Sequence, residues 1–178
     1  MRIWFVLCLA AVCVQAASAQ TLTRTTRGAW TVQTGRDVSH GQVCEAVAID
    51  PVHNATFGIN GLYNGHTVFA ASAPGWERFD QRHQRVLLGR AQDVLWQGEA
   101  VGRGNALLVR LGWPEAKAVL AKVQTGDHFE LTLAGAPSPA MSIPTDGLSD
   151  AIGLVQACMW NTASTEDRRG LQAYLPLP

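Results

Sequence analysis

Alternation of apolar and polar residues from residue 28 to about 111 predicts a series of short β-strands. Extended segments are expected at residues 29–33, 43–49, 56–63, 66–71, 85–96, 99–101 and 106–111, with a turn or bend near Gly89. Asn64-Gly65 is the strongest hairpin signal, because both residues tolerate a positive φ. Asn60-Gly61 interrupts the first arm of that hairpin and is a candidate β-bulge.

Two segments have a helical period instead. Pro114 stands at a favoured first helical position, and Gly126 is expected to end the helix that follows it. One apolar stripe runs along this helix, formed by Ala116, Val119, Leu120 and Val123. Short strands are expected after it, at 129–133 and 141–143.

The last helix begins after Asp146, whose side chain can accept backbone N–H bonds as an N-cap. Its apolar positions, spaced by four, three and four, are Leu148, Ile152, Val155 and Met159. Cys158 lies beside this stripe, so its side chain is expected to face the core.

These elements predict a β-rich α+β protein, with an antiparallel β-sandwich or a barrel-like sheet and two helices. The C-terminal helix is expected to pack on the sheet and to be tied to it by a disulfide. The expected organisation is a signal peptide at 1–19, a flexible lead at 20–27, one β-rich domain at 28–162 and a C-terminal tail at 163–178.

The first 19 residues have the pattern of a secretory signal: Arg2, an apolar run, and Ala17-Ser18-Ala19 before the cleavage point. A membrane anchor is the alternative, but the apolar run is short for a bilayer span. Since the rest of the chain has no second long apolar run, no transmembrane segment is expected after cleavage. These features predict a periplasmic or secreted protein.

Cleavage after Ala19 would remove Cys8 and Cys13 and leave Cys44 and Cys158. An even number of cysteines in an exported chain predicts a single structural disulfide. The alternative is a metal or redox pair, for which His40 is the nearby ligand type. No C-x-x-C motif supports that alternative.

The charges do not favour a nucleic-acid partner. Removal of Arg2 leaves 13 basic against 14 acidic residues, scattered along the chain. The sequence contains no G-x-S-x-G, H-E-x-x-H or P-loop motif, and its five histidines are dispersed, so neither a metal nor a cofactor is expected. We therefore expect no enzymatic activity. The enzymatic alternative is a hydrolase assembled by folding from Asp93, His128 or His66.

The segment WERFDQRHQR, residues 76–85, combines aromatic residues with three arginines. Arginines and aromatic residues are favoured in protein interfaces, so a periplasmic or envelope protein partner is expected here. The partner-binding candidates are Trp76, Arg78, Phe79, Arg82 and Arg85, together with Tyr174 of the apolar tail at 171–178. A solvated loop and a frayed tail are the structural alternatives. The functional alternative is a small-molecule or glycan-binding module that uses Trp76 and Trp160 as platforms.

The C-terminal part has a recognisable order, VLAKVQTGDHFELTLAG and then MSIPTDGLSDAIGLVQAC. This order resembles the invasion-associated locus B family of exported bacterial proteins, and it is similar to type VI secretion-associated periplasmic proteins. Trp30-x-Val32 followed by Cys44 fits both families. The resemblance spans 28–160, is carried mainly by 118–158, and gives no alignment for 55–105. It implies a periplasmic, β-rich accessory protein with a Cys44–Cys158 disulfide and no catalytic residues to carry over.

Overall fold

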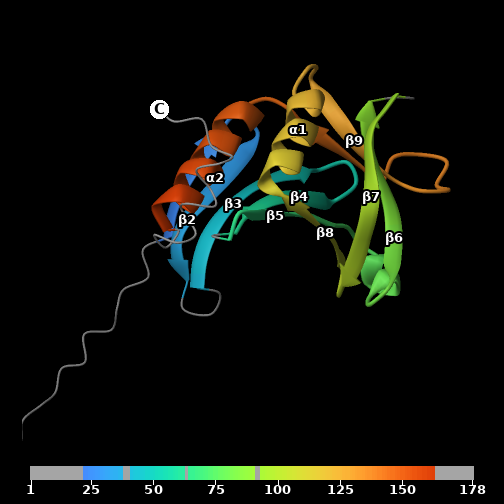
Figure 1. The fold of residues 1–178 in the computed structure, drawn as a ribbon. Coiled ribbons are helices and arrows are strands. Elements are labelled where there is room, and N and C mark those ends of the chain that lie inside the picture. Colours follow the sequence, from blue (N-terminus) through green and yellow to red (C-terminus); the bar gives the residue numbers. More distant parts are fainter. Residues whose placement is uncertain (1–21, 38–40, 63, 91–92, 163–178) are drawn as a thin grey trace, which may run out of the picture.

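A computed structural model describes residues 22–37, 41–62, 64–90 and 93–162. These residues form a ten-stranded sheet in the order β1-β2-β3-β4-β5-β8-β7-β6-β9-β10, in which all paired strands are antiparallel (Figure 1). The strands are β1 (Leu22–Arg27), β2 (Trp30–Asp37), β3 (Gly41–Asp50), β4 (Ala55–Gly61), β5 (His66–Ser72), β6 (His83–Arg90), β7 (Asp93–Arg103), β8 (Ala106–Gly112), β9 (His128–Leu133) and β10 (Met141–Pro144). The helices are the 3-10 helix η1 (Trp76–Phe79), α1 (Trp113–Val123) and α2 (Leu148–Thr162).

The sheet curls until its last strand returns to its first strands. The backbone N–H of Ser142 in β10 donates to Asp50 Oδ2 at the end of β3, at 2.6 Å. The indole N–H of Trp30 in β2 donates to the Pro144 carbonyl of β10, at 3.0 Å. The expected β-rich α+β fold is confirmed, in its barrel-like rather than its sandwich form.

The core fills the inner side of this curl. The Phe57 ring meets the rings of Trp30 and Phe129 edge-on, with centroids 6.3 and 5.6 Å apart. Helix α1 buries its predicted stripe, and α2 buries Leu148, Ile152, Val155 and Met159. Helix α2 lies across β2, β3 and β4, while α1 sits near the opening of the curl (Figure 1). The two helices therefore cover the inner side of the sheet.

Two expectations about local structure are wrong. Leu22–Arg27, expected as a flexible lead, forms β1 and pairs with β2 along its whole length. Its side chains are mostly exposed, so backbone hydrogen bonds rather than burial hold it, and an apolar pattern cannot reveal such a strand. Asn60-Gly61 is not a bulge, because β4 keeps a continuous register with β5 there. The register shift lies instead between Leu88 and Gly89.

The Asn64-Gly65 hairpin is confirmed. Gly65 has a φ of 79°, and its N–H donates to the Leu62 carbonyl at 3.1 Å. No helix among the described residues is both long and apolar enough to cross a membrane. The expected signal peptide and C-terminal tail lie outside the described residues.

Candidate interaction surfaces

The disulfide between Cys44 and Cys158 is present, so the prediction of a structural bond is confirmed. It joins the last part of α2 to β3, with the two Cα atoms 5.6 Å apart. Both residues are buried. Because the two sulfur atoms are bonded to each other, the alternative of a metal or redox pair of free thiols does not apply to this structure.

Trp76 is not a surface residue. Only 4% of it is exposed, and its ring meets that of Phe79 edge-on at 6.3 Å. Its roles as a partner contact and as a glycan platform, expected from the sequence, are therefore wrong. Trp76 instead anchors η1 to the core, since burying an indole removes a large apolar area from water.

The backbone after Trp76 is held against the β7–β8 hairpin. The N–H of Gly104 donates to Asp80 Oδ1 at 2.8 Å, and the N–H of Gly102 donates to the Arg82 carbonyl at 2.9 Å. A side chain at position 102 would overlap the Phe79 carbonyl, so glycine permits this close approach. The segment 76–82 is therefore fixed in place rather than a loose loop.

Two arginines, Arg78 and Arg82, lie on this segment, and Arg85 follows in β6. Arg78, Arg82 and Arg85 are exposed, and the Arg78 guanidinium stacks 4.8 Å from the centroid of the half-buried Phe79 ring. We call these four residues the η1–β6 surface. Stacking on an aromatic ring restrains the Arg78 side chain and leaves its N–H groups free to bind a partner.

The other candidates from the sequence do not join this surface. Tyr174 lies outside the described residues. Trp160 is half-buried on α2 and packs against the core. Trp30 and Trp113 are fully buried, whereas Trp96 is only partly buried.

The residues of the enzymatic alternative begin three different strands: His66 in β5, Asp93 in β7 and His128 in β9. Within the described part of the chain, no hydrogen bond or ion pair joins any two of them, and His128 lies 4.0 Å from Glu130 instead. In the part of the chain that the structure describes, no three or more His, Cys, Asp or Glu side chains are placed to hold a metal ion together.

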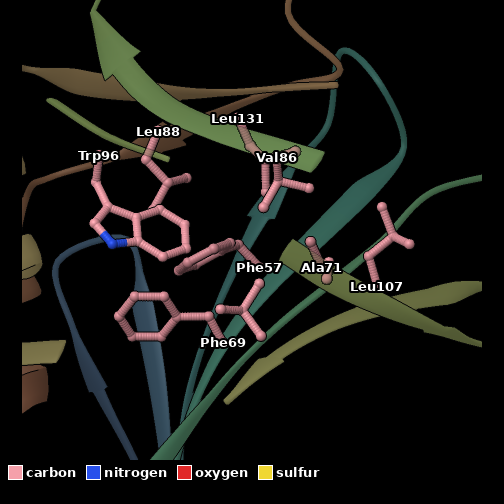
Figure 2. A pocket seen from close by; sticks show the side chains of 10 residues that line it. Phe57, Phe69, Ala71, Val86, Leu88, Trp96, Leu107 and Leu131 are labelled. Carbon is pink, nitrogen blue, oxygen red and sulfur yellow. The ribbon is translucent and has the colours of Figure 1, made fainter. Parts of the chain in front are cut away.

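The interior of the curl is closely filled. A cavity of only about 10 Å³ lies among apolar side chains that include Phe57, Phe69, Trp96 and Leu131 (Figure 2). This volume is about that of one water-sized probe, so the cavity as it stands does not admit a small-molecule ligand.

A larger hollow of about 380 Å³ opens beside the disulfide. Its polar lining includes Gln33, Gln42, Glu45 and Asn60. Burial raises the pKa of Glu45, and a hydrogen bond with Asn60 partly opposes that rise. No local pattern in the sequence indicates these residues, because they come from three separate strands and form no motif.

The observed features define a class: a curled antiparallel sheet whose C-terminal helix is locked to β3 by a disulfide. No family model matches the chain, and no curated protein matches it. The fold is similar to the crystal structure of invasion associated protein B from Bartonella henselae, with a TM-score of 0.53 and 16% sequence identity. The match covers 76% of this chain and 96% of that chain. It supports a distant structural relationship and concerns the fold alone.

Proposed function

We propose that the protein is an exported, non-enzymatic accessory protein of the bacterial envelope that binds another protein through the η1–β6 surface. The observation that carries this proposal is the exposed Arg78 guanidinium stacked on Phe79, on a segment fixed by Trp76 and Asp80. Arginine is enriched in interfaces, and a restrained side chain loses less entropy on binding. The matching partner surface is acidic, with carboxylates placed to accept from the three arginines.

Export is supported by two independent features. Residues 1–19 have the sequence pattern of a cleavable signal, and the Cys44–Cys158 disulfide suits an oxidising compartment such as the periplasm. The distant structural likeness to an invasion associated protein is compatible with the same setting.

The proposal is tested by crosslinking the tagged chain in its native envelope and identifying the captured protein. The double variant R78E/R82E should lose that protein, because two binding cations become anions. The control R24E reverses the charge of one exposed arginine on strand β1 and should retain the capture. Capture that survives R78E/R82E would reject this surface, and capture lost equally in R24E would point to a general charge effect.

The alternative function is a small-molecule or glycan-binding module, now without Trp76. The hollow beside the disulfide supports this alternative, because its volume falls within the usual range for ligand sites, about 300 to 1,000 Å³. Its amide groups and the Glu45 carboxylate suit a ligand rich in hydroxyl groups. Titration with cell-envelope sugars, followed by calorimetry, should give heat that E45Q reduces. If none of the sugars gives measurable binding heat, the alternative is rejected.

A further inference from the structure

The outer side of the sheet has a composition of its own. Inward-facing residues of β3 and β4 are buried, as in Ala46, Ala48 and Ile59. Their outward-facing neighbours are half-buried or exposed, apart from the buried Gly58, and Ile49 reaches 64% exposure. Because both helices cover the inner side, no described element shields the outer side chains of β3, β4, β5 and β8.

Cross-strand pairing arranges these outer side chains in three rows of four. The first row is Glu45, Asn60, Val68 and Arg110. The second row is Val47, Gly58, Ala70 and Leu108. The third row is Ile49, Thr56, Ser72 and Ala106. We call these twelve residues the outer face.

Size and charge are distributed unevenly across the outer face. In the second row the central residues, Gly58 and Ala70, are smaller than the flanking Val47 and Leu108. The first row has the larger pair Asn60 and Val68 at its centre. That first row carries Glu45 on the β3 flank and Arg110 on the β8 flank.

We propose that the outer face binds a second copy of this chain, about a twofold axis that runs parallel to the strands between β4 and β5. Such an axis exchanges the β3 flank of one copy with the β8 flank of the other. Glu45 then lies opposite Arg110 of the second copy, and Val47 lies opposite its Leu108. Gly58 lies opposite its Ala70. Each contact occurs twice.

The curvature of the sheet explains why small side chains near the axis favour this contact. Two convex sheets approach most closely along one line and diverge on either side of it. Small side chains at the centre let the backbones approach, and the longer flanking side chains span the wider gap. The second row has side chains that decrease in size toward the axis, as a symmetric contact of two convex faces requires at its line of closest approach.

The charges match in the same register. Among the described residues, the ion pairs within 4 Å all involve a histidine, so neither Glu45 nor Arg110 has a partner of opposite charge there. Glu45 is half-buried, which makes its ionised form costly unless a cation lies nearby. A guanidinium from the second copy would compensate that charge at both ends of the interface.

The area indicates weak association. Four strands about 4.8 Å apart and three rows about 6.7 Å apart span about 400 Å² on each copy. Protruding side chains and the adjoining strands raise this to about 600 Å², or about 1,200 Å² in total, the lower end of specific interfaces. The expected dimer is therefore transient, with a dissociation constant in the micromolar range.

Sedimentation velocity over a concentration series tests the proposal, using the chain without residues 1–19. The wild type should shift from monomer to dimer. R110E and E45R should each weaken the dimer at least about tenfold by placing like charges opposite one another. E45R/R110E should restore it, because the ion pair is rebuilt with reversed polarity.

Two controls keep the test decisive. R24E changes the charge on the same side of the sheet, at the β1 edge and beyond the twelve-residue face, and should leave the dimer unchanged. E45Q keeps the shape of Glu45 and should weaken the dimer less than E45R, so a folding defect in E45R would not decide the outcome.

A monomer at all concentrations, or a dimer insensitive to R110E and E45Q, would overturn the proposal. Failure of E45R/R110E to restore association in folded protein would overturn the register. R78E/R82E should not affect the dimer, so this test is independent of the proposed partner surface.

Discussion

Gly61 of β4 lies directly beneath Met159 of α2. A Cβ atom at position 61 would overlap the Met159 side chain and come within 2.9 Å of Val155 Cγ1. Both side chains belong to the apolar stripe with which α2 packs on the sheet. The glycine therefore lets helix and sheet approach closely at this point, and it provides that space without a bulge.

Replacement of Gly61 by alanine should destabilise the protein by about 1 to 3 kcal/mol, the usual cost of overpacking a core. Urea denaturation would measure the loss. G58A is the matched control in the same strand, because a Cβ there meets Asn60 Nδ2 at 3.4 Å and no closer atom. In the M159A background, G61A should cost less than in the wild type. Equal costs in both backgrounds would show that Met159 is not what position 61 accommodates.

Removal of the disulfide should destabilise the protein more than G61A, D50N or R90A. The bond joins residues separated by 114 positions, and chain entropy for a loop of this size corresponds to about 4 to 5 kcal/mol. C44S/C158S should show this loss in urea denaturation, and reduction of the wild type should reproduce it. An unchanged unfolding midpoint would mean that packing of α2 alone holds the C-terminal helix.

Asp50 should stabilise the closure between β3 and β10. Its carboxylate is 4% exposed and accepts from the N–H groups of Ser142, Val52 and His53. Burial alone would raise the pKa of Asp50, but these bonds and one with the His53 ring outweigh it, so the pKa is lowered. D50N should cost about 2 kcal/mol at neutral pH, because hydrogen bonds to a charged acceptor are lost.

The cost of D50N should depend on pH in a definite direction. A lowered pKa means that the unfolded chain takes up the proton more readily than the folded protein. The contribution of Asp50 is therefore complete above the ordinary aspartate pKa, about 4, and is lost as the pH falls through the lower folded value. Thermal unfolding of wild type and D50N at several pH values should converge toward acid. A D50N difference that stays constant over this pH range would contradict the assignment.

Arg90 should stabilise the end of α1. Its guanidinium donates to the carbonyls of Lys122 and Val123, at 3.2 and 2.9 Å, where the helix leaves acceptors unsatisfied. R90A should lower the free energy of unfolding by about 1 kcal/mol, and R90K should retain part of the stabilisation that Arg90 provides. Hydrogen exchange in α1 is the sensitive measurement, with R24A as control. Unchanged protection of the last turn of α1 in R90A would contradict this role.

Local chemistry in the sequence predicted much of the fold. The Asn64-Gly65 turn, the apolar stripes of both helices and the inward position of Cys158 depend on near neighbours, and the structure confirms all three. Strand β1 escaped prediction because its stability comes from backbone pairing with β2. Trp76 was misassigned because an aromatic residue among arginines has the same sequence pattern whether its ring is buried or exposed.

The sequence by itself determined the period of each element, its turns and the inward position of Cys158 on its helix, because these follow from residues a few positions apart. Only the tertiary structure decided which residues share a surface. Curling the sheet brings Ser142 to Asp50, and strand order places Glu45 and Arg110 at opposite ends of one row. Such relationships arise from pairing between strands distant in the chain, and the local pattern of apolar and polar residues carries no record of that pairing.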